Sequence, residues 1–357
     1  MYTCRFKQKS AKVLFFFLGL MLSTNHGATA SENISTSKSY VPKRTYKLCF
    51  KEENTQSSLM SFEDNLRDYG LPSSYDIRSL IGGDTRAVVD LPVYDQFSLG
   101  SCTANAAAGA MQFLRLTAKQ SPNFSPSRLF IYYVERSARG TINYDSGATI
   151  ADSVRALISN GACDEKIWPY TISQFKTKPS TTAYTEAKRY VCLDRISQIK
   201  LSQTKTSIAG ALSKGWPVLG GFMLYQSSES DETEKTGNLP FPNTGKEAFL
   251  GGHALMLVGY NDQSVTIRNS WGTDWGNKGY GTIPWEYVLN SKLAGDFWTV
   301  TKISNKPSPS IRPSISPFVR IISIFFMPQN LLNSDEEASS KDAIVRMTEA
   351  MKVFGSL

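Results

Sequence analysis

The chain has 357 residues, of which 41 % are hydrophobic and 20 % are charged, proportions typical of a globular protein. The net charge is +8, but four of the positive charges lie in the first thirty residues, which hold no acidic residue. Because the rest of the charge is mild and evenly spread, we expect no nucleic-acid partner and no attraction to a membrane surface.

Residues 1–30 have the pattern of a secretory signal. A basic region ends at Lys12, and the apolar stretch 13–22 that follows is too short to span a bilayer as a helix. Ala28 and Ala30 then provide the small residues that signal peptidase accepts. We expect cleavage after Ala30, a secreted protein in the periplasm or outside the cell, and no stable membrane insertion afterwards. An uncleaved anchor is the alternative, against which the small-residue site argues.

Residues 31–70 are polar and rich in Ser, Lys and Glu, which predicts a pro-segment and not part of a core. A short strand-like patch lies within them at 46–50. Regular apolar spacing begins near Leu71, and we expect the main domain to cover 71–304.

Helices are expected first in this domain, and strands later. Ala-rich or amphipathic runs predict helices at 102–116, 125–138, 149–159 and 204–214. Short apolar or alternating runs between turn residues predict strands at 217–225, 253–260, 265–269 and 279–283. A long polar loop, 226–250, is expected between the first two strands. A helical half therefore precedes a β-rich half, which suggests two lobes with a cleft between them.

Two further segments follow the domain. A Pro- and Ser-rich linker covers 305–317 and should be extended. The tail, 318–357, ends in a predicted amphipathic helix that begins near Ser339. The tail either packs on the domain or has a partner-binding or membrane-touching role, and the sequence leaves these alternatives open.

A cysteine and a histidine in the domain have the setting of a catalytic pair. His253 is the one histidine left once residues 1–30 are removed, and Cys102 lies at the predicted start of a helix. A helix N-terminus and a neighbouring imidazolium both stabilise a thiolate, the form of cysteine that attacks carbonyl groups. The alternatives are a structural histidine and a buried, inert cysteine.

Two more residues complete this chemistry. Gln96 lies six residues before Cys102, and its amide would form an oxyanion hole with the Cys102 backbone N–H. Asn269 ends a predicted strand, and its amide oxygen would accept a hydrogen bond from His253 and fix the ring. Trp271 would shield that bond from water. Each signal is weak alone, because glutamine is a surface residue and tryptophan a core residue by default.

Four segments of the chain resemble the papain family of cysteine peptidases: DQFSLGSC (95–102), GACDEKIWPY (161–170), GGHALMLVGY (251–260) and IRNSWGTDWGNKGYGTI (267–283). The order Gln, Cys, His, Asn, with six residues from Gln to Cys and sixteen from His to Asn, resembles that of the family. The resemblance covers residues 71–304. It implies an α+β, papain-like fold, with a helical N-terminal lobe, a β-rich C-terminal lobe and the active-site cleft between them.

The resemblance also implies a role for each residue. Cys102 would attack the scissile carbonyl as one half of a thiolate–imidazolium pair. His253 would protonate the leaving amine and then activate water, with Asn269 orienting its ring and Gln96 stabilising the oxyanion. Substrate binding would fall to Gly147, Gly252 and Trp271.

The chain departs from the commonest family pattern beside its nucleophile. Leu99 and Thr103 stand where many members have Cys and Trp, so a disulfide from position 99 is absent. The sequence LGSCTANA and the short lead-in resemble the bacterial, xylellain-like branch, which carries a compact inhibitory pro-segment. If Cys102 must stay reduced, Cys163 and Cys192 are the natural candidates for a disulfide in an oxidising compartment.

The leading interpretation is a secreted cysteine peptidase, made as an autoinhibited zymogen, that hydrolyses protein or peptide substrates and carries its inhibitory pro-segment in cis. We expect no metal and no cofactor, because the exported part offers no zinc ligand set. Two alternatives stay open. One is a transpeptidase, amidase or deamidase with the same Cys-His-Asn geometry, and the other is a catalytically silent secreted protein that binds a partner in its cleft. The intact Gln, Cys, His and Asn argue against the second.

Overall fold

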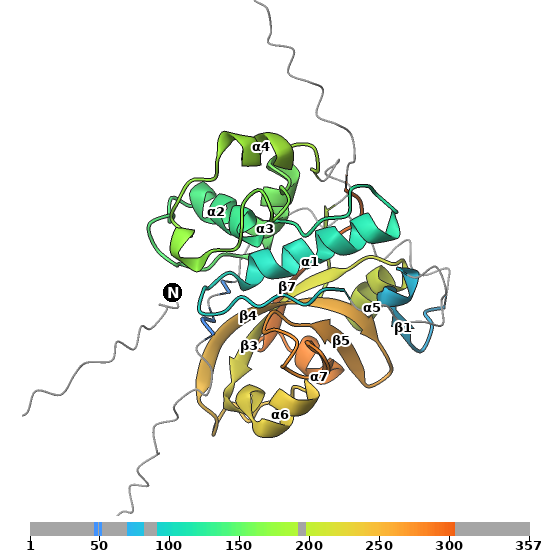
Figure 1. Ribbon diagram of the computed structural model, residues 1–357. Coiled ribbons are helices and arrows are strands. Elements are labelled where there is room, and N and C mark those ends of the chain that lie inside the picture. The colour runs from blue at the N-terminus through green and yellow to red at the C-terminus, as the bar shows by residue number, and fades with distance from the viewer. Residues whose placement is uncertain (1–45, 49, 52–69, 82–90, 192–197, 304–357) are drawn as a thin grey trace, which may run out of the picture. The chain divides into compact units, whose positions relative to one another are not determined.

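The computed structural model of the chain describes residues 46–48, 50–51, 70–81, 91–191 and 198–303 (Figure 1). The chain divides into two units after Asn305, and all described residues belong to the first. The predicted signal, linker and tail lie outside the described residues. Within the described part of the chain, no helix is both long and apolar enough to cross a membrane.

Helices make up the first half of the described chain, as the sequence predicts. Ser127, Thr149 and Ser180 each cap the start of one of them by accepting a hydrogen bond from a backbone N–H. Thr149 and Asp152 form a capping box, in which each side chain accepts from the other's backbone. The helices are α1 (Cys102–Thr117), α2 (Arg128–Ala138), α3 (Ile150–Ser159) and α4 (Thr181–Ala187), of which α4 is not predicted.

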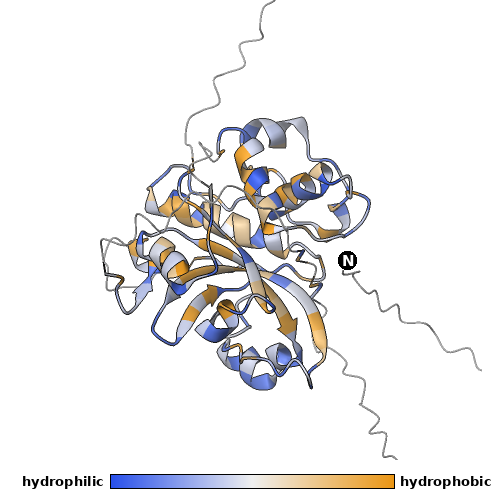
Figure 2. Cartoon of the chain, turned by 180° about the vertical axis from the view of Figure 1, so that it is seen from behind, coloured by the Kyte–Doolittle hydropathy of each residue, from blue (hydrophilic) through white to orange (hydrophobic). Residues whose placement is uncertain are grey.

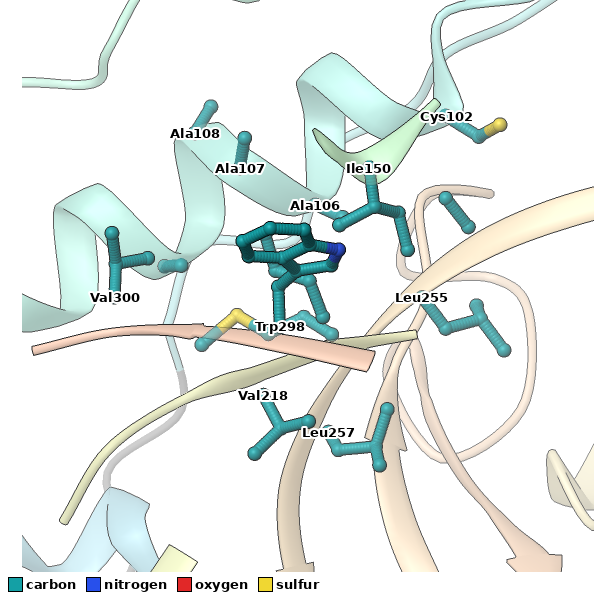
Figure 3. Packing of buried hydrophobic residues seen from close by; sticks show 14 of the residues in the cluster. Cys102, Ala106, Ala107, Ala108, Ile150, Val218, Leu255, Leu257, Trp298 and Val300 are labelled. Atoms are coloured by element: carbon teal, nitrogen blue, oxygen red, sulfur yellow. The ribbon is translucent and has the colours of Figure 1, made fainter. Parts of the chain in front are cut away.

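Helix α1 packs between α2 and α3 on one side and the sheet on the other (Figure 1). Its run of alanines is buried, and a methyl group added at Gly109 would overlap the buried side chain of Arg268. Small residues thus let the helix approach the sheet closely. Figure 3 shows the ring of Trp298 beneath Ala106 and Ala107, where larger helix side chains would leave it no room.

Seven antiparallel strands form the sheet, in the order β2-β7-β3-β4-β5-β6, with β1 paired to the end of β4. The central strands β3 and β4 are buried along most of their length, which explains their continuous apolar sequences. The strands are β1 (Tyr75–Asp76), β2 (Gln198–Lys200), β3 (Val218–Tyr225), β4 (Phe249–Tyr260), β5 (Ser264–Arg268), β6 (Tyr280–Pro284) and β7 (Ala294–Val300).

Smaller helices connect these strands. The predicted helix α5 (Lys205–Ser213) is capped by Thr204, and Gly215 follows it with φ of 78°, a backbone conformation that glycine adopts without strain. The short helix α7 (Trp285–Val288) and the 3-10 helices η2 (Ile77–Leu80) and η3 (Ile172–Gln174) are not predicted.

The predicted loop 226–250 is wrong in part. It contains the 3-10 helix η5 (Gln226–Glu229), the helix α6 (Asp231–Thr236) and the first residues of β4, which begins at Phe249 and not at His253. The charged run DETEKT is helical because Ser230 caps it and acidic residues fill its first turn. Figure 2 shows this helix as hydrophilic, in contrast to the hydrophobic strands above it.

The strand-like patch at 46–50 forms no strand at its described residues. The described residues of this patch, 46–48 and 50, have no regular secondary structure. The apolar side chains of Tyr46 and Phe50 contact Trp271 and Gly221 on the sheet side. Lys47 contacts Asp145 on the other side, so the alternation reflects the two sides of a groove and not a place in a sheet.

The structure describes one of the two cysteines of the predicted disulfide. Cys163 is a buried, free thiol, while Cys192 lies outside the described residues. Burial raises the pKa of Cys163 to about 12, so its thiol stays protonated and unreactive.

Candidate active site

Cys102 is the first residue of α1, and hydrogen bonds fix the loop before it. The Ser101 N–H donates to the Leu99 carbonyl at 2.8 Å, and the Ser101 hydroxyl lies 2.6 Å from the Tyr170 hydroxyl. Asn105 Nδ2 donates to both oxygens of Ser101. Cys102 is fully buried, and in Figure 3 its sulfur points away from the other labelled residues, off the end of the helix. The positive end of the helix dipole therefore lies at the sulfur and favours its thiolate form.

His253 and Asn269 are held together on the sheet. Nε2 of His253, in β4, lies 2.8 Å from Oδ1 of Asn269, which directly follows β5. The Trp271 ring stacks on the imidazole with centroids 4.9 Å apart, and Trp275 packs edge-on against Trp271. Among the described residues, Nδ1 of His253 makes no hydrogen bond. The ring is thus oriented through one nitrogen, and the other is available for proton transfer.

Gln96 forms hydrogen bonds both to the loop before Cys102 and to Ser270, the residue after Asn269. Its backbone N–H donates to the Ser270 carbonyl at 2.9 Å, and its Oε1 accepts from the Ser270 hydroxyl at 2.7 Å. With Oε1 engaged, Nε2 donates to the Leu99 carbonyl at 3.0 Å and to the Lys47 carbonyl at 3.4 Å. A fully buried amide nitrogen beside the loop of Cys102 fits the predicted oxyanion donor.

A buried arginine supports the same loop from behind, and the sequence analysis does not identify it. Arg128 pairs with Glu165 at 2.7 Å and stacks over the Tyr170 ring at 3.9 Å. It also donates to the Asp95 carbonyl and to Oδ1 of Asn105. These partners are far apart in sequence, so no local pattern brings them together.

Residues 46–51 lie across the residues predicted for catalysis and binding. The Tyr46 ring stacks on Trp271 with centroids 5.0 Å apart and an interplanar angle of 8°, and its hydroxyl donates to the Trp271 carbonyl at 2.9 Å. The next residue, Lys47, turns its carbonyl to Gln96. One end of the segment therefore covers the ring that shields the His253–Asn269 hydrogen bond.

The other end of the segment fills a hollow on the sheet side. The Phe50 N–H donates to the Gly252 carbonyl at 2.9 Å, and the Lys51 N–H donates to the Ala148 carbonyl at 3.0 Å. A methyl group at Gly221 would overlap the Phe50 ring, and one at Gly252 would overlap the Phe50 carbonyl and crowd the ring. The two glycines thus make the space that the ring occupies, with 7 % of Phe50 exposed.

The two ends of the segment contact the two sides of the groove. Lys47 contacts Gln96, which is bonded to the loop before Cys102, and Phe50 contacts the residue before His253. Three residue steps separate Lys47 from Phe50, and an extended chain advances at most about 3.6 Å per step. Lys47 and Phe50, which contact the cysteine loop and the histidine strand, are therefore at most about 11 Å apart along the segment.

Burial in this covered groove sets the protonation of His253. It lowers the pKa of His253 to about 4, and the hydrogen bond with Asn269 opposes the shift in part. The imidazole is therefore neutral at pH 7 while the segment is in place. The imidazolium that the family resemblance implies is not the form favoured in this state.

The predicted binding residues differ in what they contact. Gly252 and Trp271 touch the covering segment directly. Gly147 donates its N–H to the Tyr132 hydroxyl at 3.1 Å, and its neighbour Ala148 makes the contact with Lys51 instead. The role of Gly147 in substrate binding stays a prediction.

Comparisons with known proteins agree with this site. The family model of the papain family cysteine proteases matches residues 71–293. The uncharacterised peptidase C1-like protein L477 of Acanthamoeba polyphaga mimivirus is 33 % identical over 285 residues, which are 78 % of this chain and 89 % of that protein.

Solved structures give the same result. Xylellain, a cysteine protease from Xylella fastidiosa, is 34 % identical, with a TM-score of 0.64 over 72 % of this chain and 97 % of that chain. The proCathepsin B S9 of Trypanosoma congolense is 16 % identical, with a TM-score of 0.56 over 73 % of this chain and 87 % of that chain, and shares the fold.

A cysteine at a helix tip beside a sheet that carries a His–Asn pair defines a cysteine-type peptidase. The chain belongs to the papain family of cysteine proteases. The predicted family, the α+β papain-like fold and the class of enzyme are confirmed.

Proposed function

We propose that the protein is an exported peptidase zymogen, in which residues 46–51 block the groove until they are removed. The observation that carries this proposal is that the segment contacts Gln96, Trp271 and Gly252, three of the residues predicted for catalysis and binding. A substrate needs the same surfaces, so the segment and a substrate exclude each other.

In the proposed reaction, the Cys102 thiolate attacks the carbonyl carbon of the scissile bond and forms a sulfur–carbon bond. Gln96 and the Cys102 N–H stabilise the negative oxygen. Breakdown of this intermediate expels the amine, which takes a proton from His253, and leaves a thioester. His253 then takes a proton from water, whose oxygen attacks the thioester and releases the acid and the thiol.

Removal of the segment would also change the histidine. With Tyr46 and Phe50 gone, water reaches the groove, and the pKa of His253 would rise from about 4 toward its ordinary value. A proton can then move from the Cys102 thiol to Nδ1, giving the ion pair of the active enzyme. The segment therefore blocks both substrate access and activation of the nucleophile.

Export is the second part of the proposal. It is supported by the basic start, the short apolar stretch and the small residues at Ala28 and Ala30. N-terminal sequencing of protein recovered from outside the cytoplasm should begin at Ser31, and recovery of an intact Met1 chain in the cytoplasm alone would contradict export.

Catalysis is tested on the full chain with an epoxysuccinyl probe and a fluorogenic peptide. The probe should add to Cys102, as shown by mass spectrometry of the digested protein. Cys102→Ser should lose at least a thousandfold in turnover while keeping the unfolding midpoint of the native protein. No adduct and no turnover under any activating condition would contradict the proposed peptidase.

Latency is tested by sequencing the N-terminus of the active species. Turnover should rise as chains that begin after residue 51 accumulate. In Cys102→Ser these shorter chains should form only when another peptidase is added, and turnover should stay low even then. A chain that still begins at Ser31 and turns over peptide as fast as the processed form would overturn the blocking role of residues 46–51.

A further inference from the structure

A carboxylate that the catalytic scheme does not use lies in the same groove. Asp145 Oδ2 pairs with Nζ of Lys47 at 2.7 Å, and the Asp145 backbone carbonyl accepts from the same nitrogen at 2.5 Å. We infer that Asp145 determines specificity, and that the enzyme selects peptides with a lysine or arginine immediately before the scissile bond. This inference deepens the proposed peptidase function and rests on it.

The carboxylate is fixed by the enzyme itself. The Tyr132 hydroxyl donates to Oδ1 of Asp145, and the Gly100 N–H donates to the same oxygen at 3.1 Å. Burial and the nearby carboxylate raise the pKa of Tyr132, so the phenol keeps its proton and remains a donor. Both partners belong to the peptidase domain, so the orientation of Asp145 does not depend on the segment.

Lys47 indicates which substrate position the carboxylate faces. Its carbonyl oxygen accepts from Nε2 of Gln96 at 3.4 Å, the atom predicted to stabilise the oxyanion. In a substrate, the carbonyl at that donor is the one attacked, and it belongs to the residue immediately before the scissile bond. The side chain of the same residue reaches Asp145 here. Asp145, which also accepts from the Gly100 N–H in the loop before Cys102, therefore lies beside the position of the residue whose carbonyl is attacked.

Departure of the segment leaves this carboxylate without its lysine. The Asp145 side chain is 13 % exposed even with the segment in place, so it lies at the wall of the groove and not in bulk solvent. A partly buried carboxylate is stabilised by a cation more strongly than an exposed one. A lysine ammonium repeats the contact of Lys47, and an arginine guanidinium offers a planar pair of donors to the same group.

The test uses two fluorogenic peptides that differ only before the scissile bond, one with arginine and one with citrulline, which has the same shape without the charge. They are compared on full chains that carry Phe50→Ala, with Asp145 native or changed to Asn. Asn keeps an acceptor for Gly100 and Tyr132. The ratio of kcat/KM for the two peptides cancels the fraction of molecules that remain covered.

The native residue should favour arginine over citrulline at least tenfold, and Asp145→Asn should bring the ratio to within threefold of one. Asp262→Asn, at an exposed carboxylate outside the groove, should keep the native ratio. A native ratio near one, or a ratio unchanged in Asp145→Asn, would overturn the inference, and the first result needs no variant to fold. Absence of turnover of both peptides in every chain would instead contradict the peptidase function, and the inference with it.

Discussion

The residues predicted for catalysis, Gln96, Cys102, His253 and Asn269, form a frame that the segment 46–51 covers. The frame and the segment are in contact, yet they are held in different ways. Gln96, His253 and Asn269 are at most 2 % exposed, and each is fixed by hydrogen bonds to buried neighbours. The described residues of the segment, 46–48 and 50–51, have no regular secondary structure, and Tyr46 is half-buried. Their contacts include a ring stack, an ion pair, the buried Phe50 ring and backbone hydrogen bonds.

This difference follows from what each part has to do. Proton transfer and oxyanion stabilisation need atoms placed within tenths of an ångström, which requires a closely packed surrounding. A segment that must leave needs only enough contacts to outcompete substrate while it remains part of the chain. Contacts worth about 1–3 kcal/mol each are sufficient for that and are easily lost.

The largest expected effect is in the frame. Asn269→Ala removes the acceptor that orients His253, so kcat/KM for a fluorogenic peptide should fall by about a hundredfold or more. Oδ1 of Asn269 also accepts from the Ser270 N–H at 2.8 Å, so the free energy of unfolding should fall by about 1 kcal/mol as well. Steady-state kinetics per probe-labelled site measure the first effect, and denaturant unfolding measures the second.

Asn277 provides a matched control. It lies on the same stretch of chain and is exposed, so Asn277→Ala should leave kcat/KM within about twofold of the native value. A loss below threefold in Asn269→Ala would mean that the imidazole is oriented by its stacking on Trp271 alone.

The next effect is in the segment. Phe50→Ala removes a buried ring and should weaken the covered state by about 3 kcal/mol, a factor of about a hundred. The rate at which the epoxysuccinyl probe labels Cys102 in the unprocessed chain should rise by that factor. Time-resolved mass spectrometry of the labelled protein measures it directly.

Lys51 is the control for this change, because its side chain is exposed although its backbone N–H bonds to Ala148. Lys51→Ala should label at the native rate. Gly221→Ala attacks the same contact from the enzyme side, since its methyl group overlaps the Phe50 ring, and should also speed labelling. Native labelling rates in both Phe50→Ala and Gly221→Ala would mean that the ring does not hold the segment in place.

The frame could be predicted from the sequence to a greater extent than the segment. The four residues predicted for catalysis lie in local patterns. Cys102 is at a helix start with Gln96 six residues before it, His253 is in an apolar strand and Asn269 is at a strand end. Ala-rich, amphipathic and alternating apolar runs also predict three of the four helices in the first half of the described chain. They predict the positions of β3 and β5 to within a residue.

The remainder depends on contacts between distant parts of the chain. Asp145 has no unusual neighbours in sequence, and its importance comes from Lys47, 98 residues away. The sequence around Phe50 resembles a strand, and only the structure shows that Phe50 packs against Gly221 and Gly252. The loop at 226–250 is predicted from its polar composition alone, which takes no account of Ser230, the residue that caps the helix there.

The smallest expected effect is that of acid on the covered state. The pKa of His253 is about 4 when covered and about 6.5 for an ordinary histidine. Protonation therefore favours the uncovered state, in which the ring is hydrated. The stability of the covered state should be complete above pH 6.5 and decrease as the pH falls from 6.5 toward 4, with uncovering increased on the order of tenfold at pH 5 relative to pH 7. Hydrogen exchange at the Phe50 and Lys51 amides, corrected for intrinsic rates, reports the uncovering because both amides are bonded only when the segment is docked.

His253→Gln separates this effect from other acid effects. Glutamine stays neutral throughout this range, so protection of the two amides in that variant should change by less than threefold between pH 5 and pH 7. An equal loss of protection in both proteins would mean that the acid response does not come from the histidine. If protection of the two amides increases as the pH falls, protonation of His253 does not favour release of the segment. That result would contradict the predicted direction of the effect.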